Sequence, residues 1–134
     1  MIRIAIDGPG GAGKSTIAKL VGDKLGLEYI DTGAMYRAVG LKLNRKGIKP
    51  DDLISISNVL EETTIDFVNG KIILDGDDVS DIIRTQEISK FASIYSQIPE
   101  VRSKLVDIQR RIAAGKSVIM DGRDIGTNVL TDAE

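Results

Sequence analysis

The sequence predicts an α/β fold with a parallel sheet flanked by helices, and three observations predict it. Two short apolar runs, within Ile2–Ile6 and Ser117–Asp124, each end in a turn rich in Gly and Asp, as buried parallel strands do. Amphipathic helical patterns alternate with runs of this kind. Hydrophobic residues make up 42% of the 134 residues and charged residues 28%, which suits one compact domain with a core.

Composition excludes several kinds of site. The chain has no cysteine and no histidine, which excludes disulfides, thiolate metal sites and the commonest acid-base residue. The formal net charge of −2 gives no general attraction to nucleic acid or to an anionic membrane. The N-terminus shows no charged leader and no membrane-spanning run. We therefore expect a cytoplasmic protein that binds neither nucleic acid nor membrane.

The first predicted strand, Ile2–Ile6, runs into the segment GPGGAGKST, which matches the pattern G-x-x-x-x-G-K-[ST] in full. Small residues there let backbone N–H groups surround the oxygens of a polyphosphate. A helix follows, with apolar residues at helical spacing and Gly26 as its stop, and its dipole favours an anion at the same place. A chance glycine turn is the alternative, and the flanking strand and helix argue against it. The apolar residues are Ile17, Leu20, Val21 and Leu25.

The loop therefore predicts a nucleoside triphosphate site. Lys14 can reach the β- and γ-phosphates, and the Ser15 hydroxyl can ligate Mg²⁺ bound with ATP. Thr16 caps the helix and can donate to the α-phosphate. The predicted ATP-binding residues are Gly8, Pro9, Gly10, Gly11, Ala12, Gly13, Lys14, Ser15 and Thr16.

Further elements follow in order. Leu27–Ile30 predicts a second strand, and Asp31 or Thr32 can cap a helix that ends near Gly47. Pro50 and the two aspartates after it open a third helix. The apolar residues of these two helices are Met35, Val39 and Leu43 in the first, and Leu53, Ile56 and Leu60 in the second.

The strand-helix alternation is interrupted by a hairpin. Two β-prone runs flank Asn69-Gly70, the strongest short-range hairpin signal, and we interpret residues 63–84 as a small insert within a single domain of residues 1–134. Two helices follow, over residues 85–97 and from Pro99 to Gly115. The second is expected to bury Val101, Leu105, Ile108 and Ile112. Ser117–Asp124 is then the last predicted strand.

Polar residues at strand ends suggest a second ligand. Ligands of parallel α/β sheets lie at the carboxyl ends of the strands. Thr32 and Arg37 follow one predicted strand, and Arg123 and Asp124 end another; hydroxyl and guanidinium groups suit an anion. Together with the glycine loop, these ends favour a two-substrate site over a simple hydrolase.

Each of these residues has a structural alternative. Thr32 can act only as a helix cap, and Asp124 can cap the next turn. Arg37 and Arg102 can be solvated charges on helix surfaces. The chemistry of Ser93 alone does not indicate a role in ligand binding.

Four segments, in this order and spacing, resemble bacterial cytidylate kinases: IDGPGGAGKST, DTGAMYRA, LDGDDVSDIIRT and MDGRDIGT. The resemblance covers essentially all 134 residues. It implies a P-loop kinase fold and transfer of a phosphoryl group from ATP to CMP or dCMP. The hairpin then corresponds to the nucleoside-monophosphate-binding insert of that family.

The resemblance also implies roles for single residues. The acceptor phosphate is held by Thr32, where many members have serine, and by Arg37. Arg123 binds the same phosphate and joins Lys14 as a catalytic residue. Cytosine is read by Ser93, Arg102 and Asp124. A carboxylate can accept from the cytosine amino group, where uracil presents a carbonyl.

The chain departs from the family in its length. The lid and C-terminal elements of the family are absent, so we expect these 134 residues to be inactive or weakly active alone. We expect a monomer when complete, with association of the shorter chain through uncovered apolar surface. The alternatives are a P-loop small-molecule kinase with another acceptor, or a noncatalytic nucleotide-binding module.

Overall fold

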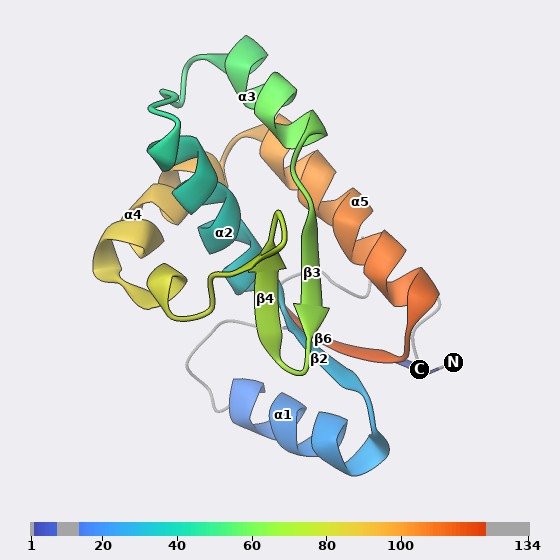
Figure 1. Ribbon diagram of the computed structural model, residues 1–134. Coiled ribbons are helices and arrows are strands. Elements are labelled where there is room, and N and C mark those ends of the chain that lie inside the picture. Colours follow the sequence, from blue (N-terminus) through green and yellow to red (C-terminus); the bar gives the residue numbers. More distant parts are fainter. Residues whose placement is uncertain (1, 8–13, 123–134) are drawn as a thin grey trace. The chain divides into compact units, whose positions relative to one another are not determined.

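The computed structural model describes residues 2–7 and 14–122, and only the backbone of Asp7, Lys14 and Ser15. Figure 1 shows its helices and strands. The chain divides into two compact units. The first unit comprises Met1–Thr32, Phe67–Gly70 and Val106–Glu134, and the second comprises Gly33–Asp66 and Lys71–Leu105. Among the described residues, no helix has the length and apolar character to cross a membrane.

A three-stranded parallel sheet forms the centre of the first unit. Its order is β1 (Arg3–Asp7), β6 (Val118–Gly122) and β2 (Glu28–Asp31). The central strand β6 is buried along its apolar part, as expected of a parallel strand covered on both faces. All three strands predicted for this sheet are therefore confirmed, as is the α/β class.

Helix α1 (Lys14–Leu25) covers this sheet through its small residues. Ala18 is fully buried against Ile119 and Leu27. A Cβ atom added at Gly22 would lie 3.1 Å from Ile119 Cγ2 and 3.3 Å from the Leu27 carbonyl oxygen. The helix therefore approaches the sheet as closely as a glycine allows.

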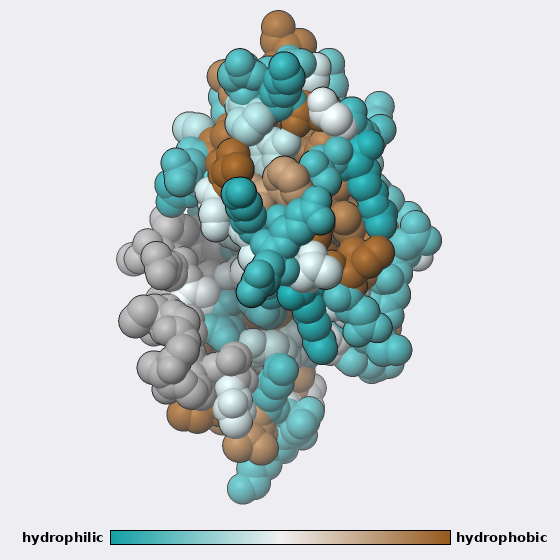
Figure 2. Space-filling view, turned by 90° about the vertical axis from the view of Figure 1, so that its left-hand side faces the viewer, coloured by the Kyte–Doolittle hydropathy of each residue, from teal (hydrophilic) through white to brown (hydrophobic). Residues whose placement is uncertain are grey.

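The large apolar residues of α1 face away from the sheet. Figure 2 shows apolar surface at the lower end of the molecule, where Figure 1 draws α1. Of the four apolar residues at helical spacing in α1, three are exposed, because Ala18 and Gly22 define the packed face. The three exposed residues are Ile17, Leu20 and Leu25, whose exposed fractions are 56%, 65% and 54%.

The second unit is mainly helical. It holds α2 (Thr32–Arg45), α3 (Leu53–Glu61), α4 (Gln86–Tyr95) and the first half of α5 (Pro99–Gly115). The inward residues predicted for α5 are buried, which confirms them, and the three apolar residues noted for α2 are buried as well. In α3, Ile56 and Leu60 are buried but Leu53 is 47% exposed. Leu53 lies in the first turn, directly after the cap residue Asp52, whose side chain accepts from the Ser55 N–H.

The predicted hairpin is present as part of a small antiparallel sheet. Its strands are β3 (Ile65–Val68), β4 (Lys71–Leu74) and β5 (Asp77–Asp78), followed by a short 3₁₀ helix, η1 (Ile82–Arg84). Asn69 and Gly70 have φ of 53° and 78°, which is the left-handed pair that a two-residue type I′ turn requires. Asp75 and Gly76, with φ of 50° and 87°, repeat this pattern before β5.

Candidate functional site

The predicted phosphate-binding loop joins β1 to α1. Strand β1 ends at Asp7 and α1 begins at Lys14, so the strand expected before the motif and the helix expected after it are confirmed. Gly8, Pro9, Gly10, Gly11, Ala12 and Gly13 lie outside the described residues. Lys14 and Ser15 begin the helix, and Thr16 is exposed on its first turn.

The register of the sheet brings three strand ends to one edge. Asp7 at the end of β1 is level with Gly122, and Asp31 at the end of β2 is level with Asp121. Because all three strands run parallel, the segments that follow them leave from the same edge. Arg123 and Asp124 follow β6 directly and lie outside the described residues.

A buried carboxylate lies at this edge. Asp121 is 6% exposed, and its Oδ2 accepts a hydrogen bond of 3.0 Å from the Tyr29 hydroxyl. Burial of a carboxylate is costly unless donors compensate it. Sequence reasoning missed both residues, although a carboxylate directly after the apolar run Val118–Met120 was the available signal.

Thr32 is joined to the same strand end. It is 5% exposed, and its hydroxyl donates a 2.9 Å hydrogen bond to the backbone carbonyl of Asp121. A hydroxyl that donates its proton in this way keeps its oxygen as an acceptor. In this structure Thr32 therefore fixes the first residue of α2 to the end of β6.

In the second unit, Arg102 interacts with the residue that precedes Arg37. Tyr36 and Arg37 are neighbours on α2, and the Tyr36 side chain hydrogen-bonds with that of Arg102 on α5. Burial raises the pKa of Tyr36, and the Arg102 charge and hydrogen bond offset only part of that rise. The bond holds Arg102 beside α2.

Ser93 lies on α4, where its side chain is exposed. Its hydroxyl donates to the Ser89 carbonyl one turn earlier, at 3.2 Å. A serine on an exposed helix face often makes such a bond. This bond shows where the Ser93 hydroxyl donates within α4. Its role in reading cytosine stays a prediction.

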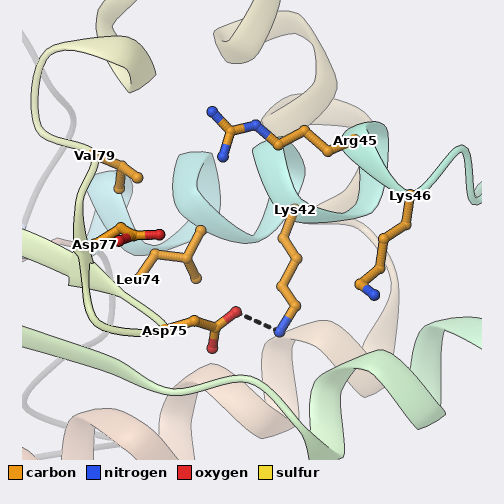
Figure 3. Close-up of a pocket in the computed structure, with 7 residues that line it drawn as sticks. All are labelled: Lys42, Arg45, Lys46, Leu74, Asp75, Asp77 and Val79. Atoms are coloured by element: carbon orange, nitrogen blue, oxygen red, sulfur yellow. Dashed lines mark ion pairs between the residues drawn. The ribbon is translucent and has the colours of Figure 1, made fainter.

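A pocket of about 180 Å³ in the second unit (Figure 3) is lined by cationic and acidic side chains together. The Lys42 ammonium lies 2.6 Å from the Asp75 carboxylate. That carboxylate also accepts from the Thr64 N–H at 2.8 Å, and Asp77 adds a second negative charge. The pocket's cations also lie near the C-terminus of α2, whose dipole is negative. The lining residues are Lys42, Arg45, Lys46, Leu74, Asp75, Asp77 and Val79.

The chain is similar to known cytidylate kinases. The family model described as Cytidylate kinase matches residues 4–134. The chain is 55% identical over 133 residues to a cytidylate kinase of Caldanaerobacter subterraneus subsp. tengcongensis, covering 99% of this chain and 59% of that protein. A cytidylate kinase of Caldicellulosiruptor saccharolyticus is 56% identical over 137 residues, covering 99% and 61%. One of Clostridium acetobutylicum is 51% identical over 132 residues, covering 98% and 61%.

The chain spans about three fifths of the length of the curated relatives that it matches. The family model nevertheless covers the chain from β1 to its last residue, including every segment on which the sequence resemblance was based. The chain belongs to the cytidylate kinase family.

Proposed function

We propose that this chain holds the donor phosphates and most of the acceptor nucleotide in an ATP-dependent kinase that converts CMP or dCMP to CDP or dCDP. The single observation that carries the proposal is the parallel register of β1, β6 and β2. This register supports the proposal that the glycine loop, the start of α2 and the segment beginning with Arg123 lie at the same edge of the sheet. Family membership supports the choice of acceptor.

On the donor side, the loop would surround the triphosphate with backbone N–H groups, and Lys14 would reach the β- and γ-phosphates. The residues present fit Mg²⁺ bound with ATP. The described residues hold no cluster of three His, Cys, Asp or Glu side chains, and Mg²⁺ with a nucleotide needs only one or two protein ligands. Ser15 and the buried Asp121 carboxylate would supply them, directly or through water. Bound Mg²⁺ would neutralise phosphate charge.

On the acceptor side, Arg37 and Arg123 would hold the monophosphate, and Thr32 would join them once its hydroxyl proton turns from the Asp121 carbonyl to a phosphate oxygen. Ser93, Arg102 and Asp124 would read cytosine, with the Asp124 carboxylate accepting from its amino group. The bond between Tyr36 and Arg102 supports this assignment, because it keeps one base-reading group beside the helix that carries Arg37.

The proposed reaction is an in-line transfer. An oxygen of the CMP phosphate forms the new bond to the γ-phosphorus, and the bond to the β–γ bridging oxygen breaks, leaving ADP. The acceptor phosphate is already ionised near neutral pH, so the transfer needs no dedicated base. Lys14 and Arg123 would offset the charge on the transferring group. We further propose that the protein is cytoplasmic, since both substrates are soluble metabolites, and that it is a monomer when complete.

A phosphoryl-transfer assay on the complete gene product tests the proposal. CMP, dCMP, UMP and AMP are offered with ATP and Mg²⁺, and the diphosphates are quantified. We expect CMP and dCMP to be preferred over UMP by on the order of a hundredfold or more, because uracil presents a carbonyl where the cytosine amino group would donate to Asp124. Preference for another acceptor would support a different P-loop kinase. Binding of ATP without a separate CMP site in calorimetry would support a noncatalytic module.

A further inference from the structure

The Asp121 carboxylate lies on the face of the sheet that α1 covers. Ile119, two residues earlier on β6, packs against Ala18 of α1. Side chains two residues apart on a strand point to the same face, and Asp121 therefore points to the α1 side. Helix α1 begins at Lys14, so the carboxylate lies on the same face of the sheet as the helix that follows the predicted phosphate loop.

Tyr29 reaches this carboxylate from a fixed position. Its ring packs against the core of Ala18, Leu27 and Ile119, and the Lys19 ammonium lies 5.6 Å from the ring centroid. A Cβ atom at Gly22 would lie 4.0 Å from the Tyr29 Cβ. The phenol is thus held between α1 and the sheet while its hydroxyl donates to Asp121 Oδ2 at 3.0 Å.

We propose that Tyr29 is a positioning residue that orients the Asp121 carboxylate toward Mg²⁺ bound with ATP. The inference rests on the proposed function. A carboxylate can accept several hydrogen bonds, so the bond from Tyr29 sets its orientation and still allows it to accept from metal-bound water. Side chains that orient a metal-binding group in this way usually change metal affinity when they are removed.

A purely structural role for Tyr29 predicts a different effect when its hydroxyl is removed. In that case the loss of its hydroxyl would lower stability and would leave the effect of Mg²⁺ on ATP binding unchanged. Tyr95 provides the matched control, since its hydroxyl donates to the Ile48 carbonyl in the second unit. Tyr95→Phe also removes one tyrosine hydroxyl bond, and it does so outside the proposed site.

The experiment uses calorimetry on the complete gene product. ATP is titrated in excess Mg²⁺ and, separately, in EDTA, and the ratio of the two dissociation constants measures the enhancement by the metal. We expect Tyr29→Phe to reduce this ratio by about tenfold without changing the dissociation constant in EDTA. Asp121→Asn should reduce the ratio at least as much, and Tyr95→Phe should leave it at the wild-type value.

Any other outcome contradicts either the positioning role of Tyr29 or the proposed function. A wild-type ratio in Tyr29→Phe, or equal weakening with and without the metal, overturns the positioning role. A wild type that binds ATP with no enhancement by Mg²⁺ overturns it as well. A wild type that binds no ATP overturns the proposed function first, and the inference with it. Thermal unfolding of Tyr29→Phe and Tyr95→Phe checks that both variants are folded.

Discussion

The Thr32 hydroxyl donates a 2.9 Å hydrogen bond to the backbone carbonyl of Asp121, 89 residues away in sequence. We expect Thr32→Val, which keeps the shape of the side chain, to lower the free energy of unfolding by about 1–3 kcal/mol, because a buried carbonyl loses its donor. Thr32→Ser keeps the hydroxyl and should lose less than the valine variant. Urea denaturation of the three proteins measures this. Equal stability of wild type and Thr32→Val would show that water replaces the bond.

Gly40 on α2 gives a second prediction. A Cβ atom there would lie 3.1 Å from the backbone nitrogen of Ala92 and 3.4 Å from the Phe91 carbonyl carbon. Backbone cannot move aside as a flexible side chain can, so Gly40→Ala should destabilise the protein by about 1–3 kcal/mol despite the better helix propensity of alanine. Gly115→Ala on α5 is the control, because its added Cβ meets nothing within 4 Å. Thermal or urea unfolding should order the stabilities Gly115→Ala, then wild type, then Gly40→Ala.

Local chemistry explains what could be predicted from the sequence. The turn at Asn69-Gly70 follows from residues that tolerate positive φ, and β6 follows from a continuous apolar run that ends in Asp-Gly. Boundaries of this kind depend on a few adjacent residues, and the structure agrees with them. The strand before the glycine loop and the helix after it could be predicted for the same reason, because adjacent residues define them.

Long-range packing explains what could not be predicted. The buried face of α1 is set by Ala18 and Gly22, because small residues permit close approach to Ile119. A search for large apolar residues finds Ile17 and Leu20 instead, and these are exposed. The bond from Tyr29 to Asp121 joins residues that are 92 positions apart in the sequence, and no local sequence pattern predicts it.

The ion pair of Lys42 and Asp75 predicts a pH dependence. Burial raises the pKa of Asp75, but hydrogen bonds from Lys42 and Thr64 and the Lys42 charge outweigh it, so the pKa lies below its usual 3.8. A lowered folded-state pKa adds stability above the unfolded-state pKa, and that stability is lost as pH falls through the folded-state value. Asp75→Asn removes the charge, and asparagine tolerates the positive φ at this position.

The side chain of Asp75 is 36% exposed, so solvent screens the pair and we expect Asp75→Asn to cost at most about 1 kcal/mol near neutral pH. The difference from wild type should shrink as pH falls from 3.8, the usual pKa of the group, to lower values. Urea unfolding at several pH values measures it. A difference that stays constant down to the lowest pH would assign the effect to packing and not to charge.

Lys14 is the residue whose loss should most affect catalysis under the proposed function. Lys14→Ala should lower turnover by about a hundredfold or more, because one positive charge on the transferring phosphoryl group is lost. Lys24, an exposed lysine in the last turn of the same helix, is the control, and Lys24→Ala should retain wild-type turnover. Steady-state kinetics of CMP phosphorylation by the complete gene product gives both values. Near-normal turnover in Lys14→Ala with a confirmed ATP site would count against the assigned role.

Tyr36 should influence the acceptor through Arg102. Its hydrogen bond to this guanidinium holds a group that we propose to read cytosine, and Arg102 is exposed, so we expect the bond to contribute about 1 kcal/mol to CMP binding. Tyr36→Phe should therefore raise the KM for CMP by roughly fivefold and leave the KM for ATP unchanged. If Tyr36 acts through Arg102, adding Tyr36→Phe to Arg102→Met should cause no further rise. An additive rise in the double variant would show instead that the two residues contact the acceptor independently.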